Sequence, residues 1–306
     1  MRPYLLFVSG AAGAVGLAFA GDMPVSRTLL GFLPLFFSYG LGQALTDCFQ
    51  TDTDSLSSPY RPLVRGLVTR RQVLSVSLVA LTACIVVLAG LNPVILAFGV
   101  ASVAGLLTYT PFKRRWWGGP PWNSWIVALL PVMGRLVDAG YSPASFFVLA
   151  DGRSLSFFLA VLAVFFAYAN FVVMGYFKDV SADLATGYRT FVVAFGWRAG
   201  RLASDAAGAA AAVLTAWSMA AAGTLSGWRI VLWAAAAAVG LWAQIGIHRV
   251  DDEKRAHGPI ANVVRCLVLY CLAIVVGLRP EWAGPAALFY LLLEAGLRLR
   301  PEESQV

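Results

Sequence analysis

The sequence predicts an all-α integral membrane protein: a nine-helix transmembrane bundle with a cytoplasmic N-terminus, forming a single domain over residues 1–306. Of its residues, 59% are hydrophobic and only 13% are charged, and the mean hydropathy is +0.73. A chain of this composition cannot cover its surface with polar groups, which excludes a soluble globular enzyme. The apolar stretches are long and continuous, whereas a transmembrane β-barrel would need alternating segments of about ten residues.

Nine apolar runs come close to the roughly 20 residues that a helix needs to cross the hydrocarbon core of a bilayer. They cover residues 3–20, 27–47, 70–90, 93–111, 122–139, 154–177, 190–222, 227–247 and 260–279. A tenth, shorter run at 283–298 is only just long enough, so it either spans the bilayer or lies in the interface.

The basic residues predict which way the bundle faces. A net charge of +7 would suggest a nucleic-acid partner in a soluble protein, but here most Lys and Arg follow the second, fourth, sixth and eighth spans. The positive-inside rule places those loops in the cytoplasm. Only five of the 23 basic residues fall on the other side: Arg27, Arg135, Arg153, Arg229 and Arg279. We therefore expect a multi-pass protein whose partner is the lipid bilayer, with no nucleic acid bound.

Five of the sixteen acidic residues lie in two short stretches at the cytoplasmic ends of spans two and six: Asp47, Asp52 and Asp54, then Asp179 and Asp183. Carboxylates at the end of an apolar helix are costly to desolvate, and those that stay there usually face a cavity or a bound cation. On a continuous helix, Asp47 and Asp54 would share one face, and so would Asp179 and Asp183.

A weak internal repeat pairs the two stretches. An offset of 129 overlays residues 36–39 (Phe-Phe-Ser-Tyr) on residues 165–168 (Phe-Phe-Ala-Tyr). The same offset places Gln50 on Asp179 and Asp54 on Asp183. Two halves of a bundle that present oxygen ligands at an equivalent depth would face one another across a shared cavity.

Oxygen ligands grouped in this way suit Mg²⁺, which takes one or two carboxylates and fills its other positions with water and substrate phosphate. The candidate ligands are Asp47, Gln50, Asp54, Asp179 and Asp183. Basic side chains stand where the charge of a bound diphosphate would need neutralising. These candidates are Arg61, Arg65, Lys113, Arg114 and Lys178.

These residues resemble the UbiA-type intramembrane prenyltransferase superfamily, which has an N-D-x-x-D-x-x-x-D stretch after its second span, a D-x-x-x-D stretch after its sixth, and nine spans. The matching positions are Asp47, Asp54, Asp179, Asp183, Arg61-Pro62, the segment 109–114 (Tyr-Thr-Pro-Phe-Lys-Arg) and Asn123. Thr46 replaces the family's Asn and Gln50 its middle Asp. Because Gln50 offers only a neutral carbonyl, one Mg²⁺ would be bound more weakly there or through water.

The resemblance implies an enzyme that uses Mg²⁺ to ionise an allylic polyisoprenyl diphosphate with a C15–C20 tail. Asp47, Asp54, Asp179 and Asp183 would be the catalytic carboxylates. Mg²⁺ and the basic side chains would stabilise the departing diphosphate, and aromatic faces would stabilise the allylic cation. The pocket candidates are Phe36, Tyr39, Phe49, Asn123, Tyr168 and Tyr176.

The fate of the cation stays open at this point. An aromatic or lipid acceptor captures it in a prenyltransferase, whereas the substrate's own double bonds capture it in a terpene cyclase. The altered first motif favours cyclisation, and the commonest activity of the superfamily favours transfer, which we rank first. A transporter would carry its charges near the midplane on broken helices, but here they lie at span ends. We expect a bacterial plasma membrane, with the active site facing the cytoplasm.

Overall fold

The computed structural model describes residues 3–141, 144, 148 and 151–299, so two of the 23 basic residues, Arg2 and Arg300, lie outside the described residues. Within these residues the chain forms twelve α-helices and no β-strand. The helices are α1 (Leu6–Phe19), α2 (Val25–Asp47), α3 (Thr51–Ser57), α4 (Arg70–Leu91), α5 (Ile95–Lys113), α6 (Gly119–Leu136), α7 (Gly152–Gly175), α8 (Val180–Ala185), α9 (Phe191–Ala221), α10 (Arg229–His248), α11 (His257–Leu278) and α12 (Ala283–Arg298).

Each of the ten apolar runs coincides with one long helix, while α3 and α8 are short additions after α2 and α7. By length and composition, six of the described helices can cross a membrane: α2, α4, α5, α7, α10 and α11. α1 is apolar but has only 14 residues, a length of about 21 Å. The chain is thus an integral membrane protein, and nine crossings remain a prediction.

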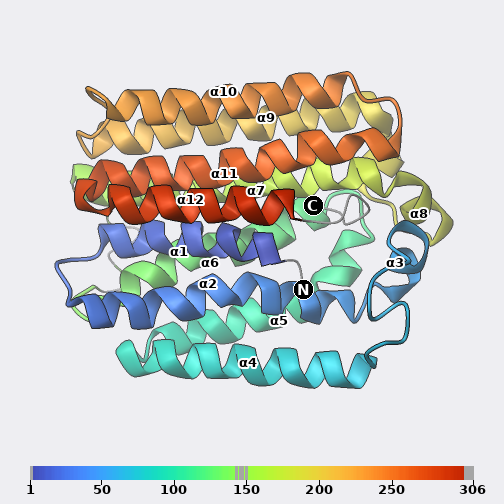
Figure 1. Ribbon diagram of the computed structural model, residues 1–306, viewed down its shortest axis with the longest axis horizontal. Helices are drawn as coiled ribbons and strands as arrows, with labels where there is room; N and C mark the ends of the chain where they lie inside the picture. The colour runs from blue at the N-terminus through green and yellow to red at the C-terminus, as the bar shows by residue number, and fades with distance from the viewer. Residues whose placement is uncertain (1–2, 142–143, 145–147, 149–150, 300–306) are drawn as a thin grey trace.

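The long helices run side by side and alternate in direction along the chain (Figure 1). Helix α2 runs towards the end of the bundle where α3 lies, and α7 runs towards the same end, where α8 lies. The N-terminus of α1 and the C-terminus of α12 also point towards this end. The two acidic stretches are therefore brought to one end of the molecule, as the even-numbered span ends require.

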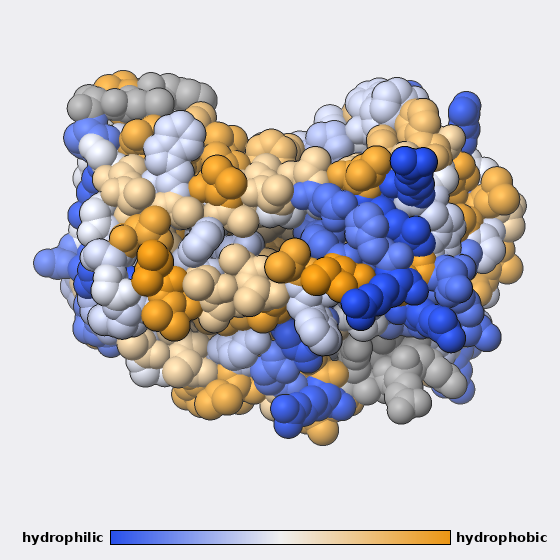
Figure 2. All heavy atoms as spheres, turned by 90° about the horizontal axis from the view of Figure 1, so that it is seen from above, coloured by the Kyte–Doolittle hydropathy of each residue, from blue (hydrophilic) through white to orange (hydrophobic). Residues whose placement is uncertain are grey.

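Burial separates the helices into an inner and an outer set. The apolar windows of α7 and α11 are each 78% buried, whereas those of α4 and α10 are each only 17% buried. α1 is also inner, since nearly all of its residues are buried. On α10 the exposed apolar side chains are Ile230, Val231, Leu241, Trp242 and Ile245. Figure 2 shows the side of the bundle to which α10 belongs, with an apolar band across its middle and hydrophilic residues gathered at the end that carries α3 and α8. The apolar band is the surface that the lipid of a bilayer contacts.

Glycines allow α1 to lie directly against α6. A Cβ atom added at Gly16 would stand 1.9 Å from the carbonyl oxygen of Pro131 and 2.6 Å from the amide nitrogen of Arg135. A Cβ added at Gly134 would stand 2.4 Å from the carbonyl oxygen of Gly13. Small residues at such crossings let helix backbones pack closely where no hydrophobic effect drives them together.

Several of the arginines on the minority side of the charge count bind the carbonyl groups at helix ends. Arg279 donates to the carbonyl oxygens of Ala18 (3.3 Å) and Ala20 (2.7 Å), and Arg153 donates to that of Phe19 (2.9 Å). Arg27 donates to the carbonyl oxygens of Leu91 and Val137. The last carbonyls of a helix have no partner within the helix, so these cations satisfy groups that lipid could not.

We expect Arg279→Ala to destabilise the folded protein by about 1.5–3 kcal/mol, the usual worth of a hydrogen bond to a charged group. The substitution leaves the end of α1 without one of its two caps. Thermal unfolding in detergent, followed by size-exclusion chromatography, should show a midpoint several degrees lower. The control is Arg249→Ala, because Arg249 is an exposed arginine that directly follows α10, at the other end of the bundle from Arg279. Equal midpoints for the two variants would contradict this role of Arg279.

The Ala-rich run at 190–222 is not one uniform helix. Gly196 within α9 has φ +80° and ψ 172°, which is not helical, and it divides a short first segment from the long remainder. Glycine adopts positive φ without the steric cost that other residues incur. This break explains why a run of 33 residues, longer than a bilayer needs, fits the bundle.

Candidate functional site

An elongated cavity begins at the end of the bundle that carries α3 and α8. Its polar lining includes Tyr39, Thr46, Asp47, Gln50, Asp54, Arg61, Tyr109, Lys113, Asn123, Tyr168, Tyr176, Lys178 and Asp179. Its apolar lining continues along α2, α4, α5 and α6 as far as Pro34, Leu88, Gly99 and Met133. From Asp47 back to Pro34 the α2 wall is about 20 Å long at 1.5 Å per residue. The cavity therefore joins a charged head to an apolar tail region.

A second, larger apolar cavity of about 640 Å³ lies at the opposite end of the bundle, between α1, α2, α11 and α12. Its charged groups are Asp22, Arg279 and Glu281, and they pair with one another. None of the predicted site residues lines this cavity. The first cavity is therefore the candidate site.

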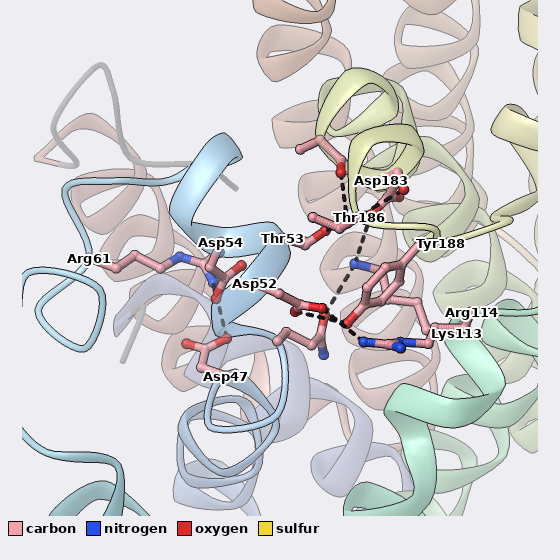
Figure 3. A network of polar contacts seen from close by, with 12 residues as sticks. Asp47, Asp52, Thr53, Asp54, Arg61, Lys113, Arg114, Asp183, Thr186 and Tyr188 are labelled. Carbon is pink, nitrogen blue, oxygen red and sulfur yellow. Dashed lines mark hydrogen bonds and ion pairs between the residues drawn. The ribbon is translucent and has the colours of Figure 1, made fainter.

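The assumption that Asp47 and Asp54 share a face of one helix is wrong. Helix α2 ends at Asp47, α3 begins at Thr51, and Gln50 between them has φ −126° and ψ 21°. The two carboxylates still converge, because Arg61 pairs with both: with Asp47 at 3.3 Å and with Asp54 at a shorter distance. Figure 3 shows Arg61 reaching both carboxylates from one side. Arg61, in the loop after α3, thus brings together the two carboxylates that were expected to lie on one face of a helix.

The second acidic stretch, which was expected to present Asp179 and Asp183 on one face, forms a single helical turn. Asp179 precedes α8, and its carbonyl oxygen accepts a hydrogen bond from the amide of Asp183 (2.7 Å). Asp179 lines the cavity, but Asp183 is fully buried behind it and does not. Thr53 lies between the two motifs, 3.4 Å from Asp183 and 2.7 Å from Thr186. These contacts join α3 to α8 at the head of the cavity (Figure 3).

Asp183 lies in surroundings that oppose its negative charge. Burial raises its pKa to about 6, although the nearby ammonium of Lys113 acts to lower it. Its Oδ1 atom is 3.5 Å from Lys113 Nζ, and its buried Oδ2 atom has no hydrogen-bond partner among the described residues. Such a carboxylate is stabilised when further positive charge is brought close to it.

Some of the predicted site residues lie outside the cavity. Arg114 is half exposed and pairs with Asp52 at 2.8 Å, while Tyr188 donates to the same carboxylate. Arg65 is exposed on the loop after α3. Phe49 lies under the guanidinium of Arg70, with 5.1 Å between that group and the ring centroid. None of these residues lines the cavity.

Phe36 lies outside the cavity as well. It packs against Phe7, Phe32 and Phe289 on the side of the bundle formed by α1, α2 and α12.

Tyr39 and Tyr168, which the internal repeat overlays at an offset of 129 residues, are in direct contact in the structure. Tyr168 donates a hydrogen bond from its hydroxyl to that of Tyr39 (2.8 Å), and their rings are 5.9 Å apart, edge to face. Asn123 donates to the hydroxyl of Tyr168 at 3.3 Å. These three side chains place a polar group and two ring systems in the cavity just below the charged head.

Sequence reasoning missed other contributors. Tyr109 lines the cavity one helical turn before Lys113, a spacing that could have identified it. A Cβ at Gly119 would stand 1.9 Å from the hydroxyl oxygen of Tyr176, so only glycine leaves room for that side chain. Glu253, from the loop before α11, accepts hydrogen bonds from the amide and the hydroxyl of Ser181, both at 2.7 Å. No local pattern indicates that last contact, since the residues are 72 positions apart.

Glu253 holds the N-terminal turn of α8, and therefore the turn between Asp179 and Asp183. For the diphosphate release that the sequence resemblance implies, we expect Glu253→Ala to lower the rate about 10- to 100-fold, as the loss of an orienting partner of a metal ligand does. The Mg²⁺ concentration for half-maximal rate should rise, while Glu253→Gln, which keeps an acceptor oxygen, should recover most of the rate. An unchanged Mg²⁺ requirement in Glu253→Ala would contradict this positioning role.

The chemistry of the donor set fits Mg²⁺. Among the described residues, no three His, Cys, Asp or Glu side chains stand close enough together to hold a metal ion unaided. Mg²⁺ does not need such a cage, because it takes one or two carboxylates and completes its shell with water and phosphate oxygens. Asp47, Asp54 and Asp179 are the carboxylates that line the cavity. Asp183 lies behind them, where its carboxylate is 3.5 Å from the ammonium of Lys113.

The fold and the site together define an integral membrane protein whose carboxylates and basic side chains line the head of an apolar cavity. The UbiA prenyltransferase family model matches residues 6–261, and the chain belongs to this family.

Sequence relatives and solved structures agree with this assignment. The digeranylgeranylglyceryl phosphate synthase of Pyrococcus furiosus is 27% identical over 201 residues, covering 64% of this chain and 67% of that enzyme. That of Halobacterium salinarum is 31% identical over 191 residues, covering 62% and 61%. An apo UbiA homologue from Aeropyrum pernix K1 has a TM-score of 0.74 at 20% identity, covering 92% and 98%. A UbiA homologue from Archaeoglobus fulgidus bound to GPP and Mg²⁺ has a TM-score of 0.64 at 18% identity, covering 90% and 97%.

Proposed function

We propose that this protein is a Mg²⁺-dependent prenyltransferase that moves a C15–C20 polyisoprenyl group from its diphosphate to a lipid alcohol or aromatic acceptor. The observation that carries the proposal is the shape of the first cavity, which joins a charged head to a long apolar tail region. Such a shape matches a molecule with a diphosphate at one end and a hydrocarbon chain at the other. One domain over residues 1–306 would carry the activity, with its head facing the cytoplasm.

The substrate's diphosphate would bind at the head of the cavity. Lys113, Lys178 and Arg61 line it and would bind the phosphate oxygens, and Asp47, Asp54 and Asp179 would hold Mg²⁺. Mg²⁺ would supply positive charge to the departing diphosphate. Preorganised charges of this kind stabilise a leaving group more effectively in a dry site than in water.

The tail region would protect the allylic cation that remains when the C1–O bond breaks. The rings of Tyr39, Tyr168 and Tyr176 lie next to the head of the cavity and would stabilise positive charge there, by about 2 kcal/mol or more each when desolvated. The apolar walls of α4, α5 and α6 would exclude water, which would otherwise capture the cation. The hydroxyl chain from Asn123 through Tyr168 to Tyr39 would orient the acceptor's nucleophile, whose proton would pass to the diphosphate.

Transfer ranks above cyclisation because the relatives reported above are named as synthases of digeranylgeranylglyceryl phosphate. Their name supports a lipid alcohol, a prenylated glycerol phosphate, as the first acceptor to test. The lining contains the tyrosines and Asn123 that such an alcohol could contact. Cyclisation without an acceptor is the alternative outcome of the same ionisation.

One assay separates the two reactions. Purified protein in detergent is incubated with Mg²⁺ and C15 or C20 diphosphate, with and without geranylgeranylglyceryl phosphate or a phenolic acceptor, and the products are extracted. We expect diphosphate release that requires both Mg²⁺ and an acceptor, and no release in the presence of EDTA. A cyclic hydrocarbon or alcohol formed without acceptor would contradict transfer. The absence of any Mg²⁺-dependent consumption under all conditions would contradict the proposed function.

A further inference from the structure

Lys113 occupies the point where the two acidic stretches meet. Its Nζ atom is 3.1 Å from Oε1 of Gln50, in the first stretch, and 3.5 Å from Oδ1 of Asp183, in the second. A side chain that bonds to both stretches at once takes the bridging position that a metal ion shared between two carboxylate groups would take.

The ammonium group is held in this position. The side chain of Lys113 is only 7% exposed, and the nitrogen lies 5.1 Å from the ring centroid of Tyr188. Tyr188 is fixed in turn, since its hydroxyl donates to Asp52 and its ring lies under the guanidinium of Arg114. Lys113 therefore has little room to withdraw when a substrate binds.

Because Gln50 is neutral, the positive charge of Lys113 is balanced by the single negative charge of Asp183. A carboxylate at this position would add a negative charge beside Asp183 and would favour a divalent ion between the two. The neutral amide leaves one positive and one negative charge there, namely Lys113 and Asp183. A divalent cation placed beside the fixed ammonium would be repelled, because a buried pair of like charges is screened only weakly.

We propose that the site binds a prenyl diphosphate with a single Mg²⁺, on the side of Asp47 and Asp54, and that the ammonium of Lys113 takes the place of a second metal ion. This inference rests on the proposed function and specifies how that site neutralises the diphosphate. Gln50 is then a specificity-determining residue for the number of metal ions, acting through its contact with Lys113.

The test counts metal ions directly. Purified protein is saturated with geranylgeranyl S-thiolodiphosphate, which resists ionisation, and is titrated with Mn²⁺ while free Mn²⁺ is measured by electron paramagnetic resonance. The wild type should bind one ion per chain. The double variant Gln50→Asp/Lys113→Met should bind two, because it restores a carboxylate and removes the competing cation.

A matched variant controls for the loss of a lysine from the same cavity. Lys178 also lines the cavity, whereas the bridge between Gln50 and Asp183 described above is made by Lys113. The double variant Gln50→Asp/Lys178→Met should therefore still bind one ion, since Lys113 stays in place. Elution volume and thermal midpoint report whether each variant is folded.

Two ions bound by the wild type would overturn the inference, and this measurement needs no variant. One ion bound by a folded Gln50→Asp/Lys113→Met variant would overturn it as well. The complete absence of analogue-dependent Mn²⁺ binding in the wild type would contradict the proposed function itself and, with it, this inference. A count of one in a protein that fails to turn over any acceptor would leave the metal count correct and only the reaction wrong.

Discussion

Replacing Asp54 by alanine is expected to lower the rate of diphosphate release by about 10²–10³-fold or more, the scale on which loss of a preorganised electrostatic contact slows an enzyme. Asp54 is buried on the cavity wall and pairs with Arg61. The variant loses a metal ligand and also leaves the guanidinium of Arg61 without its closest carboxylate. Release of diphosphate from a radiolabelled C20 substrate measures the effect.

Asp52→Ala is the matched control, since Asp52 belongs to the same short helix α3. Its carboxylate is 40% exposed and pairs with Arg114 outside the cavity. We expect its rate to stay within a few-fold of the wild type. Equal losses in the two variants would mean that α3 is needed for folding and not for chemistry, and a normal rate for Asp54→Ala would place the metal elsewhere.

Gly16→Val is expected to have the largest effect on stability, a loss of about 3 kcal/mol, the upper end of the usual cost of overpacking. The added Cβ would fall 1.9 Å from a backbone oxygen of α6. Backbone cannot move aside as the end of a flexible side chain can, so α1 and α6 must separate along their whole contact. We expect little folded protein in detergent extracts and a strongly lowered unfolding midpoint in whatever is recovered.

Gly90→Val separates this steric effect from the general cost of valine in a helix. Gly90 lies in α4, and nothing stands within 4 Å of a Cβ atom added there. Its midpoint should change by no more than a few degrees. A Gly16→Val variant as stable as Gly90→Val would show that α1 does not pack against α6 as described.

The helices could be predicted from the sequence because a bilayer demands long apolar segments. All ten runs coincide with helices, and the two acidic stretches do lie at one end of the bundle. The break in α9 was missed because a glycine within an apolar run does not by itself indicate that the helix stops there. The positive φ of Gly196 could be seen only in the structure.

The site was predicted less completely, since spacing along the chain says little about turns. The residues between Asp47 and Thr51 are not helical, so Asp47 and Asp54 do not share a helical face as expected. They meet instead because both pair with Arg61. Arg114 and Lys113 are neighbours in sequence, yet only Lys113 lines the cavity, because successive side chains around a helix point about 100° apart. Contacts such as Glu253 with Ser181 depend on how loops from distant helices meet, and no periodicity reports that.

The central claim is that residues from both halves of the bundle converge on one magnesium-bound diphosphate. A crystal structure with Mn²⁺ and a prenyl thiolodiphosphate, with anomalous data collected for manganese, tests it most directly. The account predicts one anomalous peak, beside Asp47 and Asp54, with the diphosphate within reach of Lys113 and the tail along α2 towards Pro34. A diphosphate bound instead in the second cavity, beside Arg279 at the opposite end of the bundle, would contradict it.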